Sequence, residues 1–341
     1  MDFWKPEHLE AWAATVLERS GLDGDAARLA ASVLVQTDMR GVRTHGLSRI
    51  PAYVQNLASG VSKAKPNFAF EQAAGTVVCE ADCGLGQVAG TQVVRHAVEK
   101  ARSQAIVSVT IRNIGHLGAL GVLLLEAARN GMMALLMQNG PRLMAPVGAR
   151  QRAIGNNPLA FAAPVDGGVP LVFDMATSET AFGRILEAAR AGEDIPANWA
   201  LDQQGNPTTD PQAALSGILL PSAGFKGIGL SMMVECLAGV LTGTDPSKSG
   251  DGRSLPGSFG AFLLVVNPAL LVGEDAFRAN MRLWMSRYRE AGDMAYPGER
   301  AAAKEALART EGVDLSPALV TDLAKLGDSD GNPFPRPFRT A

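Results

Sequence analysis

Between residues 75 and 273, short runs of β-forming residues alternate with longer runs of helical character, and this alternation restricts the possible fold more than any other feature. The β-type runs are Thr76–Cys79, Ile106–Ile111, Met132–Met137, Leu159–Ala162, Leu171–Phe173 and Phe259–Val266. The helical runs lie near 87–104, 118–130, 181–191 and 226–242. Such alternation is typical of α/β proteins, in which helices cover a sheet. We therefore predict an α/β fold for this part of the chain.

Helical patterns flank the α/β portion on both sides. On the N-terminal side they run from Pro6 to Gly21, from about Asp23 to Arg40, and from Leu47 to Gly60 with a break near Pro51. Residues 61–75 are interpreted as a polar connection. On the C-terminal side, helices are expected from about Glu274 through Leu326, followed by a loose tail. We predict an N-terminal helical part (1–74), a central α/β part (75–273) and C-terminal helices (274–341) that pack back on the N-terminal part.

The composition excludes several classes of function. The chain has 341 residues, a net charge of −3 and no cluster of basic residues, so we expect neither a nucleic acid nor a membrane surface as a partner. The longest apolar run, Ala261–Val266, is far shorter than the roughly 20 residues of a membrane-spanning helix. Cys79, Cys83 and Cys236 cannot all pair and form no metal-ligand pattern. Together with an N-terminus that lacks an apolar signal core, this favours the cytoplasm.

A glycine-rich stretch, GLGQVA at residues 84–89, matches the GxGxxA pattern of dinucleotide-binding Rossmann folds. That pattern needs an acidic residue at the end of the next strand. Here the next strand is followed by Arg112 and Asn113. We therefore interpret the stretch as a turn into a helix and not as a Rossmann nucleotide site.

Two of the four histidines lie in glycine-flanked loops. His45 is in GVRTHGLSRIPAY (41–53), and His116 is in RNIGHLGALG (112–121), directly after a strand. Loops that follow strands are common positions for catalytic groups in α/β proteins, whereas a histidine bonded to loop carbonyls is the ordinary alternative. His8 and His96 lie on helical patterns and are expected to be structural or exposed.

Small-residue turns follow three further strands, at Asn139–Pro141, Ile154–Pro158 and Asp174–Ser178. Each alone is compatible with an ordinary turn, but three at strand ends favour a shared site. At GFKGIG (224–229) a helix begins with Lys226 in its first turn, which suits a phosphate or another anion. Glu235, later in the same helix, is expected to need a partner if it is buried.

Taken in order, these stretches resemble the malate/L-lactate dehydrogenase family, which also contains sulfolactate, ureidoglycolate and diketogulonate enzymes and cyclic ketimine reductases. The resemblance extends from about residue 5 to 300, and its last motif is YPGER at 296–300. It implies a non-Rossmann NAD(P)H-binding α/β fold with a central mixed sheet and a helical domain formed by both chain ends. It also implies a homodimer, and the reduction of a carbonyl or imine carbon beside a carboxylate.

The resemblance implies roles for individual residues. His45 and His116 match the family's two histidines considered as proton donor or acceptor, and we favour His116 slightly. The residues that match carboxylate binders are Arg49 and Tyr53, with Thr44 in the place of the usual serine. The residues that match cofactor-binding positions are Asn139, Asn157, Asp174, Met175, Ala176, Lys226, Gly298 and Glu299.

The chain departs from the family pattern at Leu117, Gly140, Arg142 and Val147, and two of these departures remove aromatic residues. A wider pocket is expected, so the substrate stays open between a 2-oxo or 2-hydroxy acid and a cyclic imino acid. A non-catalytic relative that only binds nucleotide or acid is a third possibility. A metal-dependent hydrolase has little support, because the histidines show no HxH or HExxH pattern. NAD versus NADP, the stereochemistry and the physiological direction also stay open.

Overall fold

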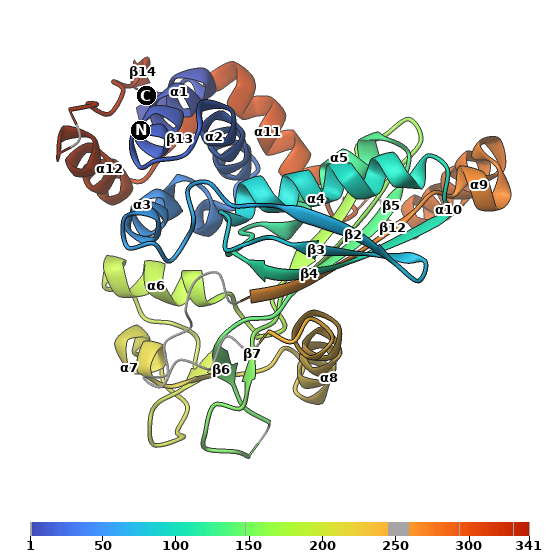
Figure 1. The fold of residues 1–341 in the computed structure, drawn as a ribbon. Coiled ribbons are helices and arrows are strands. Elements are labelled where there is room, and N and C mark those ends of the chain that lie inside the picture. Colours follow the sequence, from blue (N-terminus) through green and yellow to red (C-terminus); the bar gives the residue numbers. More distant parts are fainter. Residues whose placement is uncertain (1, 147, 245–258, 293, 330, 341) are drawn as a thin grey trace.

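The structure is a computed structural model, and it describes residues 2–146, 148–244, 259–292, 294–329 and 331–340. Its centre is a seven-stranded sheet with the strand order β2-β3-β4-β12-β5-β8-β9 (Figure 1). The strands are β2 (Ala69–Ala73), β3 (Thr76–Glu80), β4 (Ile106–Ile114), β12 (Phe259–Val266), β5 (Met133–Gln138), β8 (Leu159–Ala163) and β9 (Leu171–Met175). β3 and β4 are parallel, and all other neighbours are antiparallel. This confirms the predicted α/β fold with a central mixed sheet.

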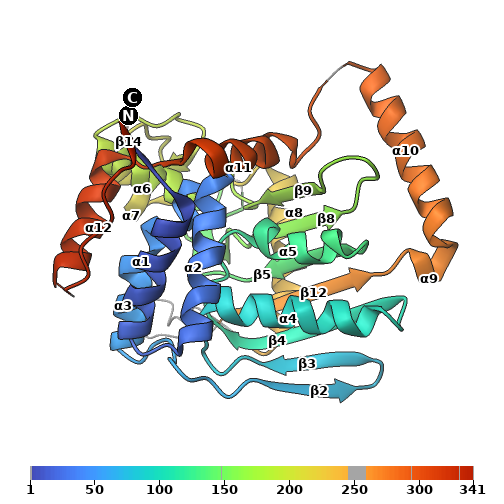
Figure 2. The same cartoon turned by 90° about the horizontal axis from the view of Figure 1, so that it is seen from above.

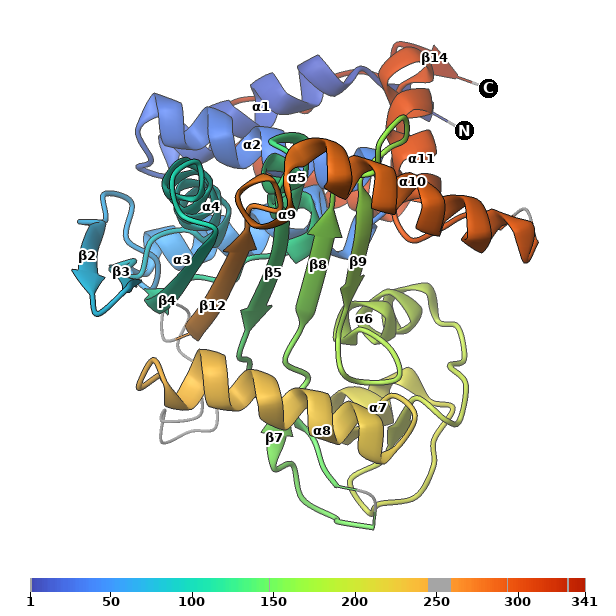
Figure 3. The same cartoon turned by 90° about the vertical axis from the view of Figure 1, so that its right-hand side faces the viewer.

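The two faces of the sheet are covered differently (Figure 3). On one face α4 (Gly86–Ala101) and α5 (Leu120–Arg129) bury alternate strand residues such as Ala261, Leu263 and Val265. On the other face, α8 (Phe225–Val234) and the π-helix η3 (Glu235–Val240) pack against Met137 and Leu159 at one end of the strands. Towards the other end, α10 (Glu274–Glu290) contributes Met281 and Met285 to a small cluster with Leu171. The helix expected over 226–242 is therefore present, but its second half is widened to π geometry.

The two ends of the chain pack together, but α10, which was also expected to pack back on the N-terminal part, does not join them. The N-terminal elements are β1 (Asp2–Trp4), α1 (Pro6–Arg19), α2 (Gly24–Met39), η1 (Arg43–His45), η2 (Leu47–Arg49) and α3 (Ile50–Ala58). The C-terminal elements are α9 (Ala269–Val272), α10, α11 (Glu299–Glu311), β13 (Val313–Asp314), α12 (Pro317–Ser329) and β14 (Arg339–Thr340). β1 pairs with β13 and β14, and a buried ion pair of 2.8 Å joins Arg40 at the end of α2 to Glu305 of α11. Figure 2 shows α11 beside α2, while α10 projects away from the body.

Several sequence expectations were wrong. The tail is not loose, because Phe334 packs edge-on against Trp12, whose Nε1 donates to Asn332 O (2.9 Å). Part of the connection 61–75 forms the edge strand β2, in which Glu71 and Gln72 are exposed. The expected break near Pro51, by contrast, is present, because the helical stretch is divided into η2 and α3, and Pro51 lies at the start of α3, where its missing N–H leaves no helical bond unmade.

A second, four-stranded sheet was not expected. Its strands are β10 (Ala200–Leu201), β11 (Ile218–Leu219), β6 (Arg142–Met144) and β7 (Ile154–Gly155), and it lies beside α6 (Phe182–Ala191) and α7 (Pro211–Ser216). None of the described helices combines the length and hydropathy that a membrane span requires.

Candidate functional site

The short turns after α2 present His45 and Arg49. Gly46 separates the two turns and lies so close to Asp38 that a Cβ there would be 2.2 Å from the carboxyl carbon. Asp38 Oδ2 accepts a hydrogen bond from the Leu47 backbone N–H (2.7 Å). The glycine and the carboxyl group together fix the path of the backbone between His45 and Arg49.

The fold brings the two predicted histidines together. The ring centroids of His45 and His116 are 5.5 Å apart, and the ring planes are inclined by 26°. Tyr53 Oη lies 3.0 Å from His116 Nδ1, and Thr44 Oγ1 lies 2.8 Å from His45 Nδ1. Arg49 Nε donates to Thr44 O (2.8 Å). All five residues that the resemblance places at the substrate therefore lie in one cluster.

The electrostatics of this cluster keep both imidazoles neutral. Burial and then the guanidinium of Arg49 lower the pKa of His45 to about 4. Burial, Arg49 and His45, in that order, lower the pKa of His116 well below its ordinary value. Both shifts have the same physical cause, because both rings are desolvated beside a cation. At neutral pH the cluster offers two neutral imidazoles and one guanidinium.

The Asp38 carboxyl beneath the turns is only 5% exposed, and within the described part of the chain its Oδ1 has no hydrogen-bond partner. Burial raises its pKa to about 7, although the Leu47 N–H and Arg43 lower the pKa, while Asp314 and Glu187 raise it slightly. A raised folded-state pKa means that protonated Asp38 stabilises the fold below the unfolded pKa near 4. This stabilisation is lost as the pH rises through 7.

We therefore expect Asp38→Asn to be more stable than the wild type at high pH. The difference in the free energy of unfolding should grow between about pH 4 and 7 and then stay constant, at on the order of 4 kcal/mol. Urea denaturation at several pH values measures it. A difference that does not change with pH would show that Asp38 titrates as an ordinary exposed carboxyl group.

The loop that carries His116 leads to Asp174. Asp174 Oδ2 accepts from the Gly121 N–H (2.8 Å) and so caps the first turn of α5. Gln138 holds the same loop, since its Nε2 donates to Gly115 O (2.9 Å) and its Oε1 accepts from Leu117 N (3.1 Å). Asp174 is exposed, yet desolvation raises its pKa to about 6. An accessible but poorly solvated carboxyl group is typical of a recessed ligand site.

Thr177 joins the turn after β9, which carries Met175 and Ala176, to the start of α8. Its N–H donates to Asn156 O (3.0 Å), and its carbonyl accepts from Ser222 N (3.0 Å). A Cβ on Gly227 would be 2.5 Å from the same carbonyl, so a glycine is needed there. Lys226 in the first turn of α8 is exposed, and its ammonium group has no partner among the described residues.

Asn139 and Asn157 are buried, and their side-chain amides are hydrogen-bonded to other groups of the protein. Asn139 Oδ1 accepts from Gly260 N (2.8 Å). Asn157 Oδ1 accepts from Gly140 N (2.9 Å), and its Nδ2 donates to Glu235 Oε2 (2.9 Å). The expected partner of Glu235 is thus confirmed. Any contact of these two loops with a cofactor would come from their backbones or neighbours. Val147, one of the departures from the family pattern, lies outside the described residues.

Gly298 and Glu299 lie beside the beginning of β9. Gly298 has φ +106°, and a Cβ there would be 2.8 Å from Val172 N. Both the backbone conformation and the lack of space therefore disfavour any side chain at this position. The Glu299 carboxylate pairs with Arg289 and accepts from Tyr296 N (3.0 Å). In this structure the Glu299 carboxylate therefore stabilises the turn before α11.

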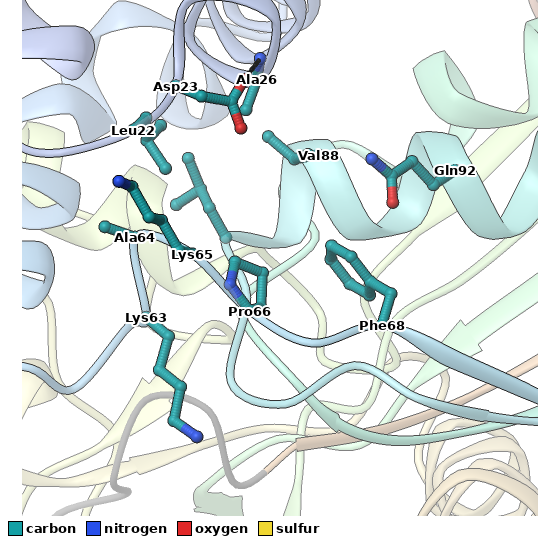
Figure 4. Close-up of a pocket in the computed structure, with 11 residues that line it drawn as sticks. Leu22, Asp23, Ala26, Lys63, Ala64, Lys65, Pro66, Phe68, Val88 and Gln92 are labelled. Atoms are coloured by element: carbon teal, nitrogen blue, oxygen red, sulfur yellow. Dashed lines mark hydrogen bonds between the residues drawn. The ribbon is translucent and has the colours of Figure 1, made fainter.

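A cavity of about 480 Å³ lies elsewhere, between the α1–α2 turn, the segment 63–68 and α4 (Figure 4). Leu85, Val88 and Gln92 of α4 line it, but none of the predicted site residues does. Within the described ranges no three His, Cys, Asp or Glu side chains are placed to hold a metal ion.

Sequence reasoning missed two residues of the histidine cluster. Of the two, only Asp38 could have been noticed in the sequence, because it is an acidic residue on the apolar side of the predicted helix that became α2. Gln87 lies in the GLGQVA stretch and is completely buried, and its Nε2 donates to Tyr53 Oη (2.9 Å). The glycines of that stretch serve the cluster, since a Cβ on Gly86 would be 2.1 Å from His116 O. This agrees with the prediction that the stretch is no Rossmann nucleotide site.

Comparison with known proteins gives consistent relatives. L-sulfolactate dehydrogenase of Methanothermobacter thermautotrophicus is 33% identical over 309 residues, which are 89% of this chain and 90% of the relative. The Delta(1)-pyrroline-2-carboxylate/Delta(1)-piperideine-2-carboxylate reductase of Pseudomonas putida is 37% identical over 325 residues, which are 93% and 95% of the two chains.

Among solved structures, delta1-piperideine-2-carboxylate reductase from Pseudomonas syringae superposes with a TM-score of 0.86 at 33% identity. The superposition covers 96% of this chain and 100% of that chain. The family model described as malate/L-lactate dehydrogenase matches residues 4–324. The chain therefore belongs to the malate/L-lactate dehydrogenase family.

Proposed function

We propose that this protein is an NAD(P)H-dependent oxidoreductase that reduces the carbonyl carbon of a 2-oxo acid, or oxidises the matching 2-hydroxy acid. The observation that carries the proposal is the cluster in which Arg49 lies beside the stacked His45 and His116. A guanidinium binds a carboxylate through two parallel hydrogen bonds, and an imidazole can exchange a proton with the neighbouring oxygen. Relatives named as sulfolactate and ureidoglycolate dehydrogenases support the same reaction class.

In this proposal Arg49 anchors the carboxylate and His116 supplies the proton. Arg49 is itself oriented by the bond from its Nε to Thr44 O, which leaves the outer guanidinium nitrogens for the substrate. Carboxylate binding also neutralises the charge that lowers the pKa of both histidines, so it favours proton uptake at the site. The depressed pKa values keep the imidazoles neutral in the free protein and thus able to accept a proton in the oxidation direction.

The residues present fit a nicotinamide cofactor. Its nicotinamide would supply or accept the hydride. The exposed ammonium of Lys226, in the first turn of a helix, is available to an anionic group of the nucleotide. The adjoining turn, Asp174 to Ala176, lies within one hydrogen bond of the loop that carries His116. The two sets of residues can therefore hold cofactor and substrate side by side.

A cyclic imino acid is the second candidate substrate. The reductases for Delta(1)-pyrroline-2-carboxylate and Delta(1)-piperideine-2-carboxylate are among the relatives, one of them at 37% identity. The same Arg49 would hold the ring carboxylate, and the histidine would then protonate the imine nitrogen. Leu117, where an aromatic residue is usual, is completely buried in the core between the sheet and its helices, so this departure from the family pattern does not by itself widen the pocket.

The test is the loss of near-ultraviolet absorbance of NADPH and NADH with purified protein and a panel of 2-oxo acids and cyclic imino acids. Turnover of one class and not the other decides between the two candidates, and the two cofactors are compared in the same assay. Tight binding of reduced cofactor without turnover of any member would instead identify a non-catalytic relative.

We also infer a homodimer in the cytoplasm. Exposed apolar side chains gather on α9–α10 and along α8–η3, and they include Leu271, Trp284, Phe225 and Val240. Groups of exposed apolar side chains are common at protein interfaces, and a two-fold pair would bury both copies of each group. The buried thiol of Cys79 and the exposed thiol of Cys236 form no disulfide, in agreement with a reducing compartment.

Leu283→Asp is expected to convert the dimer to a monomer, because it places a charge in the apolar face of α10, where Leu283 is 52% exposed. Leu307→Asp is the matched control, since Leu307 is 55% exposed but lies on α11. Light scattering coupled to gel filtration gives the mass of each variant. Equal masses for wild type and Leu283→Asp would argue against α10 as the interface.

A further inference from the structure

Gln87 is the buried residue that connects the start of α4 to the histidine cluster. Its Nε2 donates to Tyr53 Oη (2.9 Å) and is 3.3 Å from the carbonyl oxygens of both His116 and Leu117. Its Oε1 is buried and has no hydrogen-bond partner among the residues that the structure describes. No role in the proposed reaction has so far been given to this side chain.

The surroundings of Gln87 determine which way its amide faces. Carbonyl oxygens only accept hydrogen bonds, so the amide atom that faces His116 O and Leu117 O is the nitrogen. If the amide were reversed, its oxygen would face two other oxygens at 3.3 Å. An amide nitrogen only donates, and therefore Tyr53 Oη is the acceptor of the bond from Gln87.

The direction of the Gln87–Tyr53 hydrogen bond also determines the direction of the hydrogen bond between Tyr53 and His116. A phenol has one proton, and burial raises the pKa of Tyr53, so the proton stays on the oxygen at neutral pH. With its oxygen already accepting from Gln87, Tyr53 directs that proton to His116 Nδ1, 3.0 Å away. Nδ1 is then an acceptor. A neutral imidazole whose Nδ1 accepts carries its own proton on Nε2.

Close packing of glycines makes this arrangement possible. A Cβ on Gly118 would be 3.0 Å from Gln87 Nε2, and a Cβ on Gly90 would be 2.6 Å from a Leu117 methyl group. Any larger residue at these positions or at Gly86 would push α4 away from the His116 loop. The amide of Gln87 would then no longer reach Tyr53.

We propose that Gln87 is a positioning residue that acts through Tyr53 to hold His116 in the tautomer with its proton on Nε2, so that Nε2 is the atom that protonates the reduced substrate. The second half rests on the proposed function. In that step the Nε2–H bond breaks as the O–H or N–H bond of the product forms. The Tyr53 hydroxyl proton moves to Nδ1 in the same step. Water then protonates Nε2 while the Nδ1 proton returns to the Tyr53 oxygen, which restores the starting tautomer and leaves hydroxide in the solvent. His116 thus never has to be an imidazolium ion.

The test is ¹⁵N NMR of the histidine rings in the full-length protein, with His116 assigned by the signals lost in His116→Gln. We expect a protonated Nε2 and an unprotonated Nδ1 in the wild type. In Gln87→Met the two tautomers should mix, because Tyr53 can then donate or accept. Gln92→Met is the matched control, since it removes an exposed glutamine from the same helix, and it should leave the signals unchanged.

Kinetics give the second measurement. Gln87→Met should lower kcat about 10- to 100-fold with little change in KM. The reason is that a His116 ring with its proton on Nδ1 impairs proton transfer and leaves carboxylate binding unchanged. A wild-type His116 with its proton on Nδ1 overturns the proposal, even if the Gln87 variant does not fold. So does an unchanged tautomer in a folded Gln87→Met. The NMR result needs no turnover, so it stands apart from the fate of the proposed function.

Discussion

Replacing Arg49 by glutamine is expected to lower kcat/KM for any carboxylated substrate by about 10³-fold. The loss has two causes. The variant lacks the fork that binds both carboxylate oxygens, and it leaves the substrate charge unpaired in a desolvated cluster. Arg49→Lys should recover only part of the activity, because an ammonium group does not make two parallel bonds. Steady-state oxidation of NADPH or NADH over a range of substrate concentrations measures the effect.

Arg43→Gln is the matched control for Arg49→Gln. Arg43 lies six positions earlier, is exposed, and pairs with Asp314 at the protein surface. Its loss should change kcat/KM less than about threefold, because exposed ion pairs contribute little. Equal effects of the two variants would mean that the segment matters only for folding. The Arg49 variant should also raise the pKa of His45, since Arg49 lowers it in the wild type, and an NMR titration reports this independently.

His116→Gln is expected to lower kcat by about 10³-fold, and His45→Gln by much less. General acid–base groups contribute about 10²- to 10⁴-fold to rates. His116 is the ring with a directed phenol at Nδ1, whereas the Nδ1 of His45 meets the rotatable hydroxyl of Thr44 at 2.8 Å. The measurement is kcat for both variants at saturating substrate and cofactor.

The pair of histidine variants also separates positioning from proton transfer. If His45 shapes the pocket for the substrate, its variant should raise KM and leave the solvent isotope effect on kcat unchanged. A larger fall in kcat for His45→Gln than for His116→Gln would reverse the assignment of the proton donor. His96→Gln serves as a control, since the His96 ring stacks on Phe70 of the edge strand β2 and not on a ring of the histidine cluster.

The strands of the central sheet could be predicted because most of them are apolar on both faces. β12, for example, has the sequence FGAFLLVV, and such a run has few alternatives to a buried strand. β2 could not be predicted in the same way, because an edge strand with Glu71 and Gln72 looks like a polar connection. Phe334 packs against Trp4 and Trp12 of the N-terminal part. A local sequence pattern could not predict these contacts, because the residues lie far apart in the sequence.

The cluster of site residues was predictable only in part. His45 and His116 could be found because glycines flank both, and the resemblance supplied Arg49 and Tyr53. Asp38 and Gln87 act on backbone groups that become their neighbours only after folding, so no spacing in the sequence reveals them. Their burial also decides the protonation of the cluster, which residue types alone do not determine.

The central position of β1 between β13 and β14 sets an order for the synthesis of this protein. β1 and α1 leave the ribosome long before the strands and the aromatic side chain that cover Trp4 and Trp12, which lie between Val313 and Thr340. At about 5–20 residues per second that interval lasts on the order of 20–60 s. During this interval the nascent segment of β1 and α1 therefore exposes two tryptophans, which makes it a binding site for chaperones that recognise apolar segments.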